Sequence, residues 1–260
     1  MTELMVSSYS EICDYIKRVY EQGPNSGDLF YRGICGEYRL LPSIAYDWVG
    51  VPVLHIEELS GLAQSSFDQL IESQNLTQQL TDYQLRFLGR HFGLVSTYID
   101  ITFDITVALQ FGIEAAENKK KPDASFPLHL YCIDGTEIER IEQDTTTTLD
   151  KSQLAILRPK LILESDNPSL IGERTQTIQC ARLLYQPIET LLYPLDETYP
   201  NKLLKFIISP DKFSDIKKEI EQTGTSMTTD LLIQSENPIF NVVRKINSES
   251  VNEIKAKYKI

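Results

Sequence analysis

The sequence has little that would tie it to a membrane or a metal ion. No apolar run approaches the roughly 18 residues that a membrane-spanning helix needs. The segment Met1–Met5 lacks the basic start and apolar core of a signal peptide. We therefore expect a cytoplasmic protein with no membrane contact. The four cysteines form no C-x-x-C pair and the three histidines are scattered, so we expect buried thiols and no metal site.

Positive charge is also scarce. Asp and Glu outnumber Lys and Arg by 37 to 25, which gives a net charge of −12. Binding to a phosphate backbone needs a basic surface, so this composition disfavours nucleic acid as a partner. Arg86 and Arg90 lie close together in the sequence, and we interpret them as part of a solvated helix face.

Several catalytic motifs are missing from the sequence. It contains neither G-x-G-x-x-G nor a P-loop lysine motif, which disfavours a kinase, an NTPase or a Rossmann oxidoreductase. The motif G-x-S-x-G is absent as well, which weakens a hydrolase interpretation.

The hydrophobic periodicity predicts mostly helices first and mostly strands later. Ser8 and Glu11 have capping-box spacing at the start of the first helix, and Asp104 is placed to cap a later one. This order is typical of an α+β fold, here a helix-rich N-terminal half packed on a mixed β-sheet formed largely by the C-terminal half. No linker divides the chain, so we expect a single domain over residues 1–260. The expected helices cover 8–22, 54–73, 77–91, 105–117 and a stretch after residue 210, and the expected strands cover 28–32, 94–99, 126–133, 161–163, 178–185 and 203–209.

Two segments carry the polar residues of most interest. Arg32 lies at the mouth of an apolar strand, and Gly93 ends a helix that runs into a short strand closing on Asp100. A guanidinium cannot be neutralised, so near a core it needs an acidic partner or an anionic ligand. We expect Arg32 and Asp100 to share one polar pocket. Two alternatives stay open: Arg32 anchors a ligand, or it forms a structural pair with Asp100.

These residues resemble the FRG domain family, over about residues 28–235. The family's central signature reads approximately Gln-His-Tyr-Gly-Leu-Pro-Thr-Arg-Leu-Leu-Asp-Trp-Thr. Three positions depart from it, because Val95, Thr97 and Ile101 stand where the family has Pro, Arg and Trp. The likeness is carried by Tyr31-Arg32-Gly33, Leu41-Pro42, Arg90-His91-Phe92-Gly93-Leu94-Val95-Ser96-Thr97-Tyr98-Ile99-Asp100-Ile101-Thr102, Val107-Ala108-Leu109-Gln110-Phe111 and the later element Arg174–Gln179.

A weaker resemblance is to the ADP-ribosyltransferases, which use an early-strand arginine, a Ser-Thr strand and a later strand with Glu or Gln. It implies NAD as a substrate, and ADP-ribosyl transfer or NAD cleavage as the reaction, in a toxin or phage-defence effector. A guanidinium would grip anionic oxygens and hydroxyls would orient the ribose. The residues that would bind the ligand are Arg32, Ser96, Thr97, Asp100 and Tyr31, and those that would take part in the chemistry are Arg32, His91 and Gln179.

The alternative is a non-catalytic binding or regulatory module, whose partner is a small-molecule nucleotide or another protein. Thr97 removes an anion anchor of the family, and Gln179 cannot supply the negative charge that an oxocarbenium-like centre needs. Glu173 and Glu189 lie nearby in sequence as untested substitutes. Each single residue also has a structural interpretation, such as core packing for Tyr31. The oligomeric state is left open.

Overall fold

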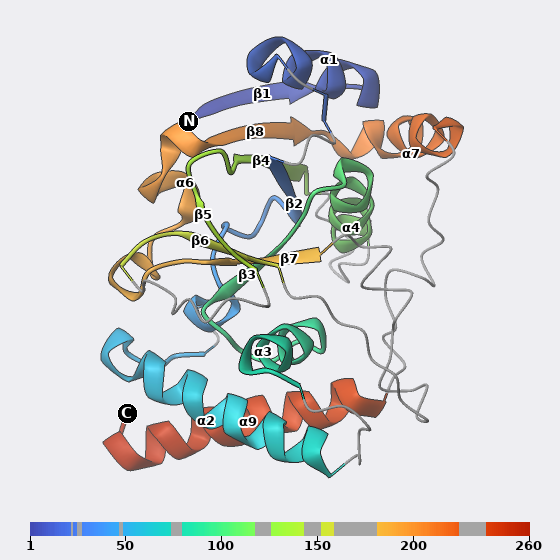
Figure 1. Ribbon diagram of the computed structural model, residues 1–260. Coiled ribbons are helices and arrows are strands. Elements are labelled where there is room, and N and C mark those ends of the chain that lie inside the picture. Colours follow the sequence, from blue (N-terminus) through green and yellow to red (C-terminus); the bar gives the residue numbers. More distant parts are fainter. Residues whose placement is uncertain are drawn as a thin grey trace.

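The computed structural model describes residues 1–21, 23–24, 28–46, 49–73, 80–117, 126–142, 152–158, 181–223 and 238–260. The predicted α+β class is confirmed, because helices pack on an eight-stranded mixed sheet (Figure 1). The strands are β1 (Thr2–Val6), β2 (Leu29–Cys35), β3 (Tyr98–Thr102), β4 (Leu128–Asp134), β5 (Glu139–Glu142), β6 (Ala155–Arg158), β7 (Ala181–Tyr185) and β8 (Leu203–Ile208).

The strand order is β1-β8-β4-β2-β3-β7-β6-β5. The pairs β1–β8 and β5–β6 are parallel and the other neighbours are antiparallel. In the middle of the sheet, β2 and β3 are joined by the single registered pair Tyr31–Thr102. The sheet therefore consists of two well-paired parts, which are connected by the short pairing between β2 and β3.

Side-chain caps fix the helix starts where the sequence predicts them. The Ser8 hydroxyl accepts a hydrogen bond from the Glu11 amide at 3.1 Å, and the Asp104 carboxylate accepts one from the Thr106 amide at 2.8 Å. These contacts satisfy amides that have no partner inside the helix. The helices are α1 (Tyr9–Tyr20), α2 (Ile56–Glu72), α3 (Asp82–His91), α4 (Ile105–Glu117), α6 (Leu195–Thr198), α7 (Phe213–Gln222) and α9 (Pro238–Tyr258).

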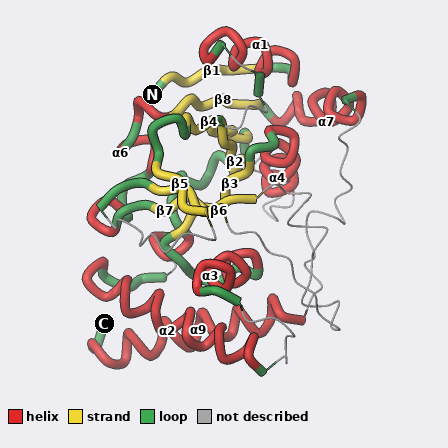
Figure 2. Tube along the Cα trace, in the orientation of Figure 1, coloured by secondary structure: helices red, strands yellow, loops and turns green. Residues whose placement is uncertain are grey.

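Apart from the short helix α6, the helices lie in two groups around the sheet (Figure 2). Apolar side chains of α1, α4 and α7 pack on one face of β1, β8, β4 and β2, around the buried Tyr31. At the other end of the molecule, α2, α3 and α9 pack on one another through residues such as Phe67 and Val243 (Figure 1). A further core, which includes Phe30 and Leu184, lies on the sheet face that carries Arg32.

Some elements were not predicted from the sequence. These are β1, β5, β6, α6 and the C-terminal helix α9. The expected strand 161–163 lies outside the described residues, so it stays a prediction. The assignment of residues 1–260 to one domain also stays a prediction. No helix in the described ranges has the length and apolar character needed to cross a membrane.

Candidate anion-binding site

The site is built where β2 and β3 part. In an ideal sheet, the pair Tyr31–Thr102 would place Arg32 and Asp100 on opposite faces, because side chains alternate along a strand. Arg32 Nη1 nevertheless lies 3.6 Å from Asp100 Oδ2. The two side chains meet because the strands share no further registered pair beyond Tyr31–Thr102.

Helix α3 delivers a second arginine to the same carboxylate. Arg90, in the last turn of α3, places Nη2 at 2.7 Å from Asp100 Oδ2. Gly93 then takes a φ of 86°, a conformation that glycine adopts without strain. The chain turns there and enters β3 two residues before Asp100. We call Arg32, Arg90 and Asp100 the arginine cluster.

The arginine cluster carries an excess of positive charge. Two guanidinium groups share one carboxylate, so the three side chains sum to one positive charge. The exposed fractions of the side chains are 31% for Arg32, 15% for Arg90 and 31% for Asp100. The Nε atom of Arg90 is buried and has no hydrogen-bond partner within the described ranges. A buried donor without a partner is unfavourable, so the cluster is suited to an anion.

Two neutral rings border the arginine cluster. Burial raises the pKa of Tyr46, although Arg32 and Arg90 act in the opposite direction. Burial lowers the pKa of His91, and the charge of Asp100 opposes this shift. Burial also lowers the pKa of Arg32, with Asp100 opposing, but a guanidinium stays charged at neutral pH. His91 and Tyr46 therefore add no compensating negative charge at neutral pH.

Ser96 and Thr97, which the sequence predicts to bind a ribose, have different surroundings. The buried Ser96 hydroxyl accepts from the Tyr98 amide at 3.3 Å, and its backbone amide donates to the Ser43 hydroxyl at 3.0 Å. Thr97 is half-buried, and its hydroxyl has no hydrogen-bond partner among the residues that the structure describes. Ser96 thus holds the segment before β3, whereas Thr97 keeps a hydroxyl available for a ligand.

The structure separates Tyr31 from the other predicted site residues. Its side chain is completely buried in the core under α1, α4 and α7, and its hydroxyl donates to the Pro24 carbonyl. Because Tyr31 and Arg32 are consecutive in β2, their side chains point to opposite faces. The predicted ligand contact of Tyr31 is therefore replaced by core packing. Gln179 and Glu173 lie outside the described residues, and Glu189 is exposed on the short helix Ile188–Thr190.

The sequence interpretation missed the role of Arg90. The sequence pattern favours a solvated helix face for Arg90, but its side chain is mostly buried against Asp100. One signal pointed to it. Arg90 stands where the FRG signature has glutamine, and Thr97 stands where that signature has arginine. Arg90 therefore brings a guanidinium to Asp100 in a segment that lacks the arginine of the signature at position 97.

Comparison with protein-family models, with curated proteins and with solved structures found no match to this chain. The resemblance to the FRG family therefore stays a prediction based on the quoted residues.

Proposed function

We propose that the arginine cluster binds the phosphates of a nucleotide and that NAD is the ligand to test first. The observation that supports this proposal is the unbalanced charge at a half-buried position, where Arg32 and Arg90 share Asp100. A pyrophosphate would supply the missing negative charge. It would also offer an acceptor to the buried Nε of Arg90.

The resemblance to ADP-ribosyltransferases supports NAD in particular. Thr97 lies between Arg90 and Asp100 along the chain, and its free hydroxyl is suited to a ribose. The reaction in this proposal is cleavage of the bond between nicotinamide and ribose, with transfer of ADP-ribose to water or to an acceptor. His91 is half-buried at the end of α3, and we assign it to organising the site rather than to proton transfer.

One observation favours a second function, a non-catalytic nucleotide-binding module. Asp100 is the carboxylate of the arginine cluster, and both arginines engage it. It is therefore poorly placed to stabilise the oxocarbenium-like centre that forms when nicotinamide leaves. Release of nicotinamide from NAD separates the two functions, because only the enzyme produces it.

Calorimetric titration of the protein with NAD, ADP-ribose and inorganic pyrophosphate tests the proposal. We expect all three to bind, and we expect Arg32→Ala and Arg90→Ala each to weaken binding by about 10- to 100-fold. This range corresponds to the roughly 1.5–3 kcal/mol of a hydrogen bond to a charged group. The matched control is Arg140→Ala, because Arg140 also pairs with an aspartate, Asp28, but lies outside the cluster.

Two outcomes of the titrations would count against phosphate binding by the arginine cluster. Equal loss of affinity in Arg32→Ala and Arg140→Ala would indicate a general charge effect. The absence of heat with all three ligands would reject the proposed function. Cell fractionation tests the cytoplasmic location that we also propose. A growth assay tests the toxin or phage-defence setting: we expect expression of the protein to inhibit growth, and expression of Arg32→Ala not to inhibit it.

A further inference from the structure

A row of polar side chains crosses the sheet and ends at Arg32. The registered pairs Glu3–Lys205, Lys205–Tyr131 and Tyr131–Arg32 connect β1, β8, β4 and β2 in turn. Side chains of directly paired residues lie on the same face, with Cβ atoms about 4.5–5.5 Å apart. The polar row of Glu3, Lys205, Tyr131 and Arg32 therefore leads away from the arginine cluster across this face of the sheet.

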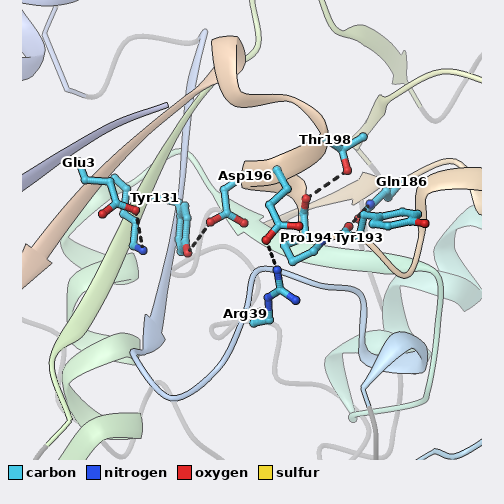
Figure 3. A network of polar contacts seen from close by, with 10 residues as sticks. Glu3, Arg39, Tyr131, Gln186, Tyr193, Pro194, Asp196 and Thr198 are labelled. Atoms are coloured by element: carbon cyan, nitrogen blue, oxygen red, sulfur yellow. Dashed lines mark hydrogen bonds and ion pairs between the residues drawn. The ribbon is translucent and has the colours of Figure 1, made fainter.

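Direct contacts hold the part of the polar row away from Arg32, and Figure 3 shows Glu3 and Tyr131 there with Asp196. Lys205 Nζ donates to Glu3 Oε1 at 3.1 Å and lies 5.7 Å from the centre of the Tyr131 ring. The Tyr131 hydroxyl donates to Asp196 Oδ2 at 3.4 Å. Asp196 belongs to α6, whose neighbouring residue Leu195 packs in the core on this face. Asp196 therefore lies on the same side of the sheet as the polar row.

Two buried polar atoms beside Tyr131 are left without a partner. Asp196 Oδ1 and His129 Nδ1 are buried, and neither has a hydrogen-bond partner within the described part of the chain. His129 is two residues from Tyr131 on β4, and the two rings pack edge-to-face with centroids 6.4 Å apart. Buried polar atoms in native proteins are nearly always hydrogen-bonded. These two atoms are therefore suited to a ligand that can form hydrogen bonds with both of them.

The charges around these two atoms favour a neutral group with hydroxyls. Asp196 and Glu3 both interact electrostatically with His129. Two carboxylates so close to the histidine would repel a negatively charged group of a ligand. Burial lowers the pKa of His129, with Lys205 acting in the same direction, so at neutral pH its ring is uncharged. A carboxylate oxygen accepts from a hydroxyl, and a hydroxyl can either donate to or accept from a neutral imidazole.

We propose that Asp196 and His129 bind the ribose hydroxyls of a nucleoside diphosphate whose phosphates lie on Arg32 and Arg90. This inference rests on the proposed function and extends it from the phosphates to the sugar. Carboxylates bind ribose hydroxyls in the same way in dinucleotide-binding folds. Tyr131 connects the two sites, because it pairs with Arg32 in register and donates to Asp196.

Calorimetric titration with three ligands tests the sugar contact: ADP, 2′,3′-dideoxy-ADP and inorganic pyrophosphate. For the wild-type chain we expect ADP to bind at least about tenfold more tightly than its dideoxy analogue, as for a hydrogen bond to a charged group. In Asp196→Ala and in the isosteric Asp196→Asn, we expect this preference to shrink. Pyrophosphate affinity should stay unchanged in both variants.

The matched control is Glu197→Ala. Glu197 is the next residue along α6, but its side chain is 58% exposed and pairs with Arg39. We expect this variant to keep the wild-type preference for ADP. Thermal unfolding of each variant checks that the fold is retained, and Asp196→Asn serves as the variant with the least change in shape.

The outcomes distinguish this inference from the proposed function. Equal affinity of the wild-type chain for ADP and its dideoxy analogue would overturn the ribose contact, while arginine-dependent pyrophosphate binding would leave the proposed function standing. A parallel loss of pyrophosphate affinity in the Asp196 variants would also overturn the ribose contact. If neither ADP nor pyrophosphate bound, the proposed function and this inference would both be rejected.

Discussion

At the residue scale, the half-buried histidines His91 and His129 contribute to how stability responds to acid. Burial lowers the pKa of His91 and that of His129, and burial is the largest cause in both cases. In the unfolded chain a histidine titrates at about 6.5. Between that value and the lower folded pKa, the unfolded state binds more protons. Acid therefore favours unfolding through these two groups.

We predict that the free energy of unfolding falls as the pH is lowered from 7.5 to 5.5, and that His91→Gln reduces this fall. The variant removes a group whose neutral form is favoured by the fold, so its stability contribution is present above about pH 6.5 and is lost below it. Urea unfolding midpoints at both pH values measure the effect. An unchanged pH response in His91→Gln would show that the histidine is equally protonated in the folded and unfolded states.

At the element scale, two glycines allow β2 and α4 to touch through their backbones. A Cβ on Gly33 would lie 1.9 Å from the Ala108 carbonyl oxygen, and a Cβ on Gly112 would lie 2.0 Å from Leu128 Cδ1. The first clash is with backbone, which cannot turn aside, and the second is with the end of the Leu128 side chain, which is itself fully buried. The close approach packs β2, the strand that carries Arg32, directly against α4.

We predict that Gly33→Ala lowers the free energy of unfolding by about 3 kcal/mol or more, the upper range for overpacked cores. The control is Gly61→Ala on α2, because a Cβ there meets nothing within 4 Å. That change should raise stability by about 0.5–1 kcal/mol through the better helix propensity of alanine. Urea unfolding measures both variants, and a Gly33→Ala protein as stable as wild type would contradict the backbone contact.

At the scale of the whole molecule, local signals and long-range pairings differ in how well the sequence predicts them. Helices with a cap and one apolar face were predicted closely, as α1 from Ser8 and α4 from Asp104 show. Arg32 and Asp100 were also predicted to share one polar pocket, and Arg32 Nη1 lies 3.6 Å from Asp100 Oδ2. Both inferences rest on residues that are close in sequence or on charges that need a partner.

The features that the sequence did not predict depend on distant segments. Strand β1 exists because it pairs in parallel with β8, where Met5 lies opposite Ile207. The polar row needs the register of four strands, which no local pattern encodes. The sequence left both a ligand contact and core packing open for Tyr31, because a strand that is buried on both faces shows no alternation of polar and apolar residues.

The C-terminal helix α9 hydrogen-bonds to the segment between Arg90 and Asp100 through the side chain of Asn247. Asn247 Oδ1 accepts from the Val95 amide at 3.0 Å, and its Nδ2 donates to the Gly93 carbonyl at 3.0 Å. Val95 and Gly93 lie between Arg90 and Asp100 in the sequence. Asn247 is itself buried, with 7% exposed. One side chain therefore joins two segments that lie about 150 residues apart in the chain through two hydrogen bonds.

We predict that Asn247→Ala lowers the free energy of unfolding by about 1–3 kcal/mol, because it leaves the buried Val95 amide without a partner. It should also weaken pyrophosphate binding, because Arg90 and Asp100 flank the released segment. The control Asn252→Ala changes an exposed asparagine of the same helix and should alter neither quantity. Urea unfolding and calorimetric titration measure the two effects. Lower stability with unchanged pyrophosphate affinity would mean that α9 supports the fold without positioning the arginines.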